Sequence, residues 1–274
     1  RLVFDYSWNL LTVTEQEVFR GLSVFRGGFT REAAQEVTGA SLRDLLGLAN
    51  KSLIHRSPTG RYEVHELLRQ YAAEKLSELP GEEQVIRERH CAYFAEFLHN
   101  RERLLFSGAR VTAVGEIAAD VENWRTAWDW AVAHGQVQQM DQCLQSMAEF
   151  FRLRGWLREA HDTLEQAADW LELEVRQEPE HSLELLLSRL RAQQGRFCDY
   201  LGLVDDAPRF LLASVSSFLT LGSLGDAAYA LCYLGGCEAL YGGFQVEPCR
   251  QALEIFEQLN DQRGKALALR GLAW

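Results

Sequence analysis

The sequence contains no run of about 18 apolar residues, so it predicts no membrane-spanning helix. It also lacks the charged, apolar and cleavable leader that directs secretion, and we therefore expect a cytoplasmic protein. The chain opens on Arg1 instead of methionine and stops at Trp274 inside a helical pattern. Both ends indicate a piece cut from a longer protein.

The six cysteines include no CxxC pair, and no histidine stands at zinc-finger spacing from any of them. The sequence therefore predicts no metal site and no redox motif. We expect the cysteines to be reduced thiols buried in the core, as is usual in cytosolic proteins.

Signatures of catalysis are missing as well. There is no GxSxG, and the string NDQRGKALA lacks the first glycine and the hydroxyl residue of a phosphate loop, GxxxxGK[ST]. His90 and Cys91 are adjacent, and adjacent side chains on a helix diverge by about 100°, so they predict no catalytic dyad. Carboxylate pairs lie on predicted helix surfaces, where they are commonly solvated. We expect no catalytic residue and no enzyme in this chain.

The net charge of −11 is unevenly distributed. Residues 1–79 carry ten basic and ten acidic residues, so the whole excess of negative charge lies in residues 80–274. Binding to nucleic acid depends on cations that neutralise phosphates. The charge distribution therefore predicts no direct contact with nucleic acid.

The first 79 residues begin with helical periodicity. Thr14, with Glu17 three residues later, is predicted to cap a helix. Val18, Leu22 and Phe25 then recur on one face of that helix, which predicts that this face is buried.

Two short helices and a hairpin follow. A second helix is predicted from Thr30 to Gly39 and a third from Ser41, and five leucines indicate that the third is mostly buried. The runs SLIHR and RYEVH, separated by the turn SPTG, predict a β-hairpin. A fourth helix is predicted from about His65 to Glu78.

This order of three helices, a hairpin and a helix is that of a winged-helix domain with one extra helix. We assign the domain to residues 1–79, because the proline and glycine that follow are typical of a boundary. Arg43, Asn50 and Lys51 are the polar side chains that the third helix offers to DNA. The predicted burial of that helix argues against sequence-specific DNA binding.

The rest of the chain consists of helical patterns separated by single glycines. Ala230 recurs as Ala268, a spacing of 38 residues, within two similar segments. Small residues repeated on one face let paired helices approach closely and stack on neighbouring pairs. We therefore expect a mainly α fold, in which a right-handed solenoid of tetratricopeptide type follows the hairpin domain. Residues 80–180 form its helical linker or repeat-like region, and residues 181–274 form truncated repeats.

His65 stands at the junction of the hairpin and the fourth helix. Composition alone favours a histidine that satisfies a backbone carbonyl there. Its position at a helix N-terminus disfavours the protonated imidazole through the helix dipole and leaves backbone amides free for an anion. The structural role and the anion-facing role both stay open at this point.

The segments LVFDYSWNLLTVTEQEVFRGLSVFRGGFTREAAQEV, LLGLANKSLIHRSPTGRYEVHELLRQYAAEKL, RERHCAYFAEFL and DVENWRTAWDWAVAHG together resemble bacterial signal-transduction ATPases of the STAND class. In that class an NB-ARC-like ATPase precedes a winged helix and a tetratricopeptide-like sensor. Val64, His65 and Glu66 match the family's MHD-type motif, with valine and glutamate in place of methionine and aspartate. The family's histidine contacts the β-phosphate of bound ADP and holds the inactive state. Because the Walker motifs are absent here, a nucleotide-binding domain would lie before Arg1.

The resemblance implies a regulatory and sensor fragment. Its winged helix would sense the ADP or ATP of an upstream nucleotide-binding domain through His65, and its helical repeats would bind an activating protein or small molecule. Oligomerisation would accompany activation, and this chain itself would hold no cofactor. One alternative is a free-standing tetratricopeptide scaffold that binds a partner protein. The other is a transcription regulator whose winged helix binds DNA, although many members of the class regulate transcription through a separate DNA-binding domain.

Overall fold

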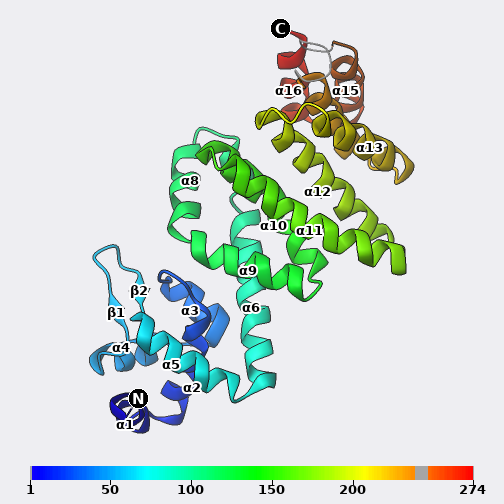
Figure 1. Cartoon of the computed structure of the whole chain (residues 1–274). Helices are drawn as coiled ribbons and strands as arrows, with labels where there is room; N and C mark the ends of the chain where they lie inside the picture. Colours follow the sequence, from blue (N-terminus) through cyan, green and yellow to red (C-terminus); the bar gives the residue numbers. More distant parts are fainter. Residues whose placement is uncertain (1, 238–245, 274) are drawn as a thin grey trace. The chain divides into compact units, whose positions relative to one another are not determined.

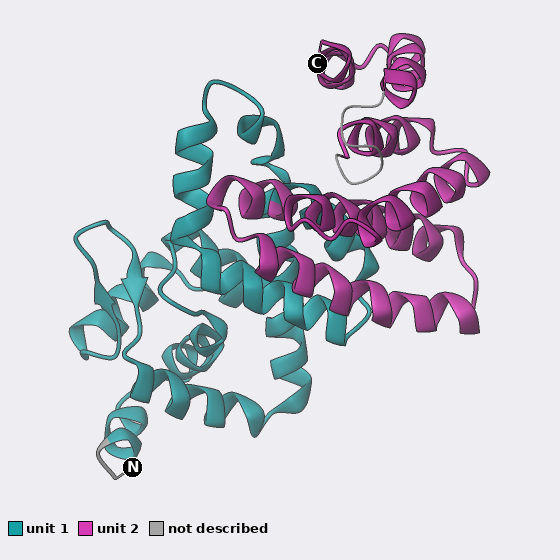
Figure 2. Cartoon of the chain, turned by 45° about the horizontal axis from the view of Figure 1, so that its top comes forward, with its two compact units in different colours: residues 1–146 teal, residues 147–274 magenta. Residues whose placement is uncertain are grey.

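The structure is a computed structural model that describes residues 2–237 and 246–273 (Figure 1). The chain is mainly helical, as predicted, and the described residues contain one two-stranded sheet. No helix among these residues is both long and apolar enough to cross a membrane. The chain forms two compact units, residues 1–146 and 147–274 (Figure 2). The boundaries predicted after residues 79 and 180 lie inside these units, and that three-part division stays a prediction.

The elements of the first unit are α1 (Leu2–Asn9), α2 (Val13–Gly21), the 3₁₀ helix η1 (Leu22–Val24), α3 (Arg31–Thr38), α4 (Leu42–Asn50), β1 (His55–Arg56), β2 (Tyr62–Glu63), α5 (Glu66–Ser77), α6 (Pro80–His99), α7 (Glu102–Leu105), α8 (Arg110–Ala119) and α9 (Val121–Ala133). Helix α10 (Val137–Arg154) begins in the first unit and ends in the second. The second unit continues with α11 (Leu157–Gln177), α12 (His181–Tyr200), α13 (Asp206–Thr220), α14 (Leu224–Gly235), α15 (Val246–Leu259) and α16 (Gln262–Leu272).

Thr12, and not Thr14, caps α2. The hydroxyl of Thr12 accepts a hydrogen bond from the Glu15 N–H at 3.3 Å, and the Glu15 carboxylate accepts one from the Thr12 N–H at 2.8 Å. Glu15 also receives the ammonium group of Lys51, a tertiary contact that local spacing does not reveal. The predicted cap at Thr14 with Glu17 is therefore wrong by two residues, because both pairs match the same spacing rule.

The caps of α3 and α4 are the predicted ones. The Thr30 hydroxyl accepts the Ala33 N–H, and Gly39 ends α3 in the left-handed region with φ +76°. Ser41 and Asp44 form a reciprocal capping box at the start of α4. Short-range chemistry thus fixes the ends of both helices.

The predicted hairpin forms, with strands shorter than the sequence pattern indicated. The register pairs His55 with Glu63 and Arg56 with Tyr62 in an antiparallel sheet. Gly60, with φ +85°, closes the turn by donating its N–H to the Ser57 carbonyl at 2.9 Å. Tyr62 also exchanges two backbone hydrogen bonds with Phe29, at 2.8 and 2.9 Å, so the segment before α3 pairs with the hairpin.

Pro80 begins a helix. Only Glu78 and Leu79 separate α5 from α6, and Pro80 is the first residue of the 20-residue helix α6. Proline suits this position because the first N–H of a helix has no intrahelical partner. Helix α6 then packs against both α3 and α9. The proline therefore starts a helix directly after α5, and the predicted boundary at this position stays a prediction.

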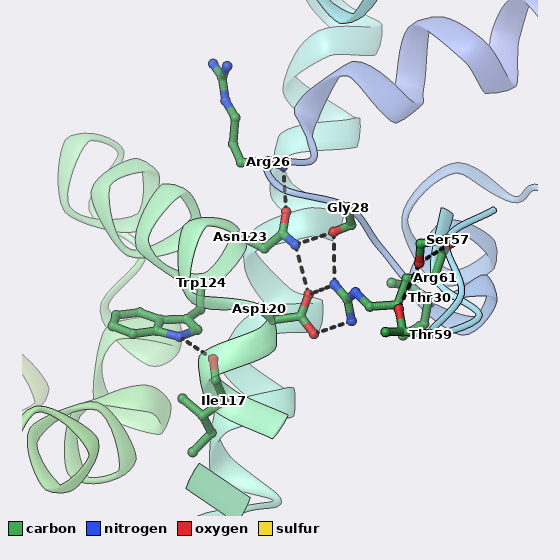
Figure 3. Close-up of polar contacts among 11 residues, drawn as sticks. Arg26, Gly28, Thr30, Ser57, Thr59, Arg61, Ile117, Asp120, Asn123 and Trp124 are labelled. Carbon is green, nitrogen blue, oxygen red and sulfur yellow. Dashed lines mark hydrogen bonds and ion pairs between the residues drawn. The ribbon is translucent and has the colours of Figure 1, made fainter. Parts of the chain in front are cut away.

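Helix α9 buries the apolar face that its sequence indicates. Trp124, Ala127, Trp128 and Ala131 are all less than 5% exposed. The Trp124 indole N–H donates to the Ile117 carbonyl at 3.2 Å, as Figure 3 shows. This contact fixes the tryptophan, whose ring would otherwise bury an unsatisfied donor.

The helices of the second unit pack in sequence order. Each helix from α11 to α16 contacts the next, and α14 also contacts α12 and α16. Helices α14 and α16 begin at Leu224 and Gln262, which reproduces the predicted spacing of 38 residues. Ala230 and Ala268 are both buried. This arrangement agrees with an α-helical repeat fold.

The string NDQRGKALA lies at the start of α16. Asp261 caps the helix by accepting the Gly264 N–H at 3.0 Å. A methyl group at position 264 would overlap the ring of Phe256 on α15. Close packing of the two helices therefore explains this glycine without a phosphate loop.

Candidate functional site

His65 is the N-cap of α5 and is exposed to solvent. Its Nδ1 accepts a hydrogen bond from the Leu67 N–H at 3.3 Å. The ring therefore satisfies a backbone donor, whereas composition had favoured a contact with a backbone carbonyl. The difference follows from helix geometry, because the first turn of a helix exposes N–H groups and not carbonyls. With Nδ1 as acceptor, the neutral ring carries its proton on Nε2, which makes that nitrogen a hydrogen-bond donor.

Glu66, next to His65, is held as a carboxylate. Arg69 donates two hydrogen bonds to it, both at 2.8 Å, and Gln70 donates another at 2.9 Å. These contacts with Arg69 and Gln70, together with the charge of Arg26, lower the pKa of the Glu66 carboxyl to about 2. Glu66 is therefore ionised throughout the neutral pH range.

Arg26 and Arg69 both pair with this carboxylate, and a third arginine, Arg87, acts electrostatically on Arg26. Partial burial and the neighbouring cations Arg69 and Arg87 lower the pKa of the Arg26 guanidinium. The Arg26 Nη1 also lies 3.9 Å from the Glu66 Oε1, and the Arg87 Nε pairs with the Glu83 Oε1 at 2.8 Å. The two carboxylates balance only two of the three positive charges. The N-terminus of α5 adds a partial positive charge, so the surroundings of His65 favour an anion.

A buried polar network connects the hairpin to the junction of α8 and α9 (Figure 3). Arg61 donates to both carboxylate oxygens of Asp120, at 2.6 and 2.9 Å, and to the Gly28 carbonyl at 3.0 Å. Asn123 donates to Asp120 and to the Gly28 carbonyl, and it accepts the Arg26 N–H at 2.7 Å. Asn123 is fully buried and Asp120 is 6% exposed. The network therefore joins the backbone of Arg26 to α9.

Arg26 consequently takes part in two contacts of the site. Its side chain lies beside Glu66 at the N-terminus of α5, and its backbone is bound by Asn123 of α9. No local sequence pattern indicates the contact between Arg26 and Asn123, since 97 positions separate them. The sequence does predict the Glu66–Arg69 pair, because acidic and basic residues three positions apart face each other on a helix.

Helix α4 is more exposed than predicted. Leu45 and Leu48 are fully buried, but Leu42 is 41% and Leu46 is 50% exposed. The helix packs mainly on α2, so only one side of it faces the core. Its outer side borders an open groove of about 910 Å³, to which Arg43 also contributes. The expectation of a mostly buried helix is therefore wrong, and with it the first argument against DNA binding.

All six cysteines are buried, as predicted, and none of them forms a disulfide in the described part of the chain. A cluster that no sequence motif indicated consists of His161, Asp162 and Glu165 of α11. In the described part of the chain, each of these residues places one potential metal-ligating atom within 4.8 Å of the others. The His161 Nδ1 lies 3.1 Å from an Asp162 oxygen, which is an ordinary contact between neighbours on a helix surface.

Comparisons with known proteins found partial similarities. No protein-family model matches the chain. Proteins of Mycobacterium bovis and Mycobacterium tuberculosis, named as HTH-type transcriptional regulators, are 30% identical over 177 residues, which is 58% of this chain and 19% of theirs. The chain thus spans about a fifth of the length of these relatives.

The solved structure of a signal transduction ATPase with numerous domains (STAND) from Pyrococcus horikoshii, a protein with a tetratricopeptide repeat sensor, also matches. The match covers 99% of this chain and 48% of that protein, with 16% sequence identity and a TM-score of 0.36. That TM-score is too low to establish a shared fold.

Proposed function

We propose that this chain is the regulatory and sensor part of a STAND-type signalling ATPase. The single observation that carries the proposal is the geometry of His65, which uses Nδ1 to cap α5 and keeps an Nε2 donor at the helix N-terminus. Arg26 and Arg69, which pair with the adjacent Glu66, supply positive charge near this helix N-terminus. This arrangement supports contact with a nucleotide phosphate held by a preceding domain.

The order of elements supports a winged-helix assignment for the region around His65. Helices α2 to α4 precede the hairpin, α5 follows it, and Phe29 adds a third backbone segment to the pair of strands. In this proposal the repeats of the second unit bind an activating ligand or protein. Activation shifts the population from a closed state to an open, oligomeric one, which requires an activator with different affinities for the two states.

The test restores an NB-ARC-like ATPase domain before Arg1 and compares two variants at position 65. His65→Ala removes both the cap and the Nε2 donor, whereas His65→Ser keeps a good helix cap without the imidazole. Since hydrogen bonds to charged groups contribute about 1.5–3 kcal/mol, we expect both variants to bind ADP at least about tenfold more weakly.

Only His65→Ala should also lower the melting temperature. His55→Ala, in the exposed hairpin, is the matched control and should bind ADP like the parent. Parental ADP affinity and parental basal activity in His65→Ser would exclude the phosphate-sensing role and leave His65 as a cap.

A DNA-binding regulator is the second candidate, because α4 is exposed and the mycobacterial relatives are named as HTH-type regulators. Against it, the exposed leucines of α4 contribute no hydrogen bonds to base edges, and the first 79 residues carry no net positive charge. A gel-shift titration with random duplex DNA at low salt, with Arg43→Ala as the comparison, tests this candidate. The absence of any shift would eliminate it.

A further inference from the structure

The second unit contains a row of arginine and tyrosine side chains on its even-numbered helices. The members of this Arg–Tyr row are Arg152 on α10, Arg196 and Tyr200 on α12, Tyr229 and Tyr233 on α14, and Arg263 on α16. Contacts link the members from helix to helix. Arg196 lies 4.8 Å from the ring centre of Tyr233, and Arg263 lies 5.2 Å from that of Tyr229.

The Arg–Tyr row is positively charged, whereas the rest of the second unit is acidic. Residues 147–274 carry 12 basic and 19 acidic residues, so this part of the chain is acidic. Within the row, Arg152 and Arg196 share a single carboxylate, that of Glu149. Although burial raises the pKa of the Glu149 carboxyl, Arg152 and Arg196 together hold it below its usual value. The cluster of two guanidinium groups and one carboxylate therefore keeps one positive charge.

Arg196 is buried but only weakly hydrogen-bonded. Its side chain is 11% exposed, and its hydrogen bonds are 3.1 Å to Glu149, 3.3 Å to Tyr200 and 3.4 Å to Gln193. Arg152, in contrast, holds the same carboxylate at 2.6 and 2.9 Å. Ionic hydrogen bonds are usually about 2.7–2.9 Å long. A buried guanidinium with three long contacts has unused capacity for an acceptor.

We propose that Arg196 anchors a binding site for an oxyanion, a carboxylate or phosphate group carried by a small molecule. Arg152, 31% exposed, supplies the second cation, and the hydroxyl of Tyr200, a residue that is 44% exposed, supplies a neutral donor. A planar guanidinium binds such groups with two parallel hydrogen bonds. The inference rests on the proposed sensor function and names the chemistry that the second unit recognises.

The neighbouring tyrosines indicate where the rest of the ligand would lie. Tyr229 and Tyr233 are four residues apart on α14 and therefore lie on the same face of that helix. Both are partly exposed, which leaves ring surface for the remainder of the ligand. The oxyanion thus sits at Arg196, and the apolar or flat part of the ligand extends over α14.

The test uses residues 1–274 alone and measures binding of inorganic phosphate and of citrate by calorimetry, at constant ionic strength. The two anions distinguish a phosphate site from a carboxylate site. Arg196→Met should weaken binding of the preferred anion at least about tenfold. Arg191→Met is the matched control on the same helix, because Arg191 also forms ion pairs and an aromatic contact, with Asp169, Glu172 and Phe210. It should bind the anion like the parent.

A second variant keeps the test decisive if Arg196→Met fails to fold. Glu149→Gln removes the internal carboxylate that competes for both arginines, so it should tighten anion binding severalfold. A purely structural ion cluster predicts the opposite pattern, with no anion binding in the parent or in Glu149→Gln. That result would overturn the inference, as would equal losses in Arg196→Met and Arg191→Met. Because the ATPase domain takes no part, these outcomes do not depend on the result at His65.

Discussion

Arg61 and Asp120 form a two-pronged ion pair, 59 residues apart in sequence, that joins the hairpin to the start of α9. Both side chains are largely buried, at 18% and 7% exposure. The pair crosses the position at which the sequence predicted a domain boundary. It lies in the same network that binds the backbone of Arg26, so movement of the hairpin would disturb the surroundings of His65.

Asp120→Asn should therefore lower the free energy of unfolding by about 3 kcal/mol, because removing one partner leaves the other charge buried without compensation. Urea titration measures the change. Glu122→Gln is the matched control, since Glu122 lies two positions after Asp120 and also pairs with an arginine, Arg125, but is 58% exposed. Exposed pairs contribute about 0–1 kcal/mol. Equal losses in the two variants would show that the Arg61–Asp120 pair is no stronger than a surface contact.

His90 should make the protein sensitive to acid. The ring is 2% exposed against Phe25 and Phe94, and burial lowers its pKa to about 3, against the opposing effect of a hydrogen bond to Asn123. The unfolded chain has the ordinary value of about 6.5, so between these values the unfolded state binds the extra proton. The stability that the protein gains by burying a neutral His90 is therefore fully present above pH 6.5, and it is lost as the pH falls towards 3.

The measurement compares the parent with His90→Gln at several pH values. The difference in unfolding free energy should change by about 1.4 kcal/mol per pH unit below pH 6.5 and should be constant above it. His99→Gln, an exposed site on the same helix, controls for the general effect of acid. Parallel curves for the parent and His90→Gln would contradict the buried, neutral histidine.

Features encoded within a few residues were predictable, and features that depend on distant partners were not. The caps at Thr30 and Ser41 follow from side chains that reach backbone groups three residues away. The hairpin likewise follows from its turn residues. The exposure of α4 depends on which helices cover it, and the Arg61–Asp120 pair depends on the folded path between two distant segments. A motif indicates His65, but its use of Nδ1 as a cap depends on the folded geometry at the start of α5.

Gly264 should tolerate no side chain. A methyl group there overlaps the ring of Phe256, and overpacking of this kind costs about 1–3 kcal/mol. Gly264→Ala should lower the melting temperature, and adding Phe256→Leu should recover part of the loss. Gly115→Ala is the matched control, because its Cβ would meet nothing within 4 Å in helix α8. Replacing a helical glycine in open space should stabilise the protein by about 0.5–1 kcal/mol. The two glycine-to-alanine substitutions should thus change the stability of the protein in opposite directions. A loss of stability at both positions would contradict the packing argument.

The two threonines at the start of α2 provide the sharpest test of the corrected cap. Thr12 accepts the Glu15 N–H, whereas Thr14 lies within the first turn, exposed to solvent. Thr12→Ala should cost about 1 kcal/mol, because it removes the acceptor of an N-terminal amide and half of the capping box. Thr14→Ala should change the unfolding free energy by no more than about 0.5 kcal/mol. Denaturant titrations of both variants measure the two values. The reverse order would restore the cap that spacing alone had favoured at Thr14, and it would move the start of the helix by two residues.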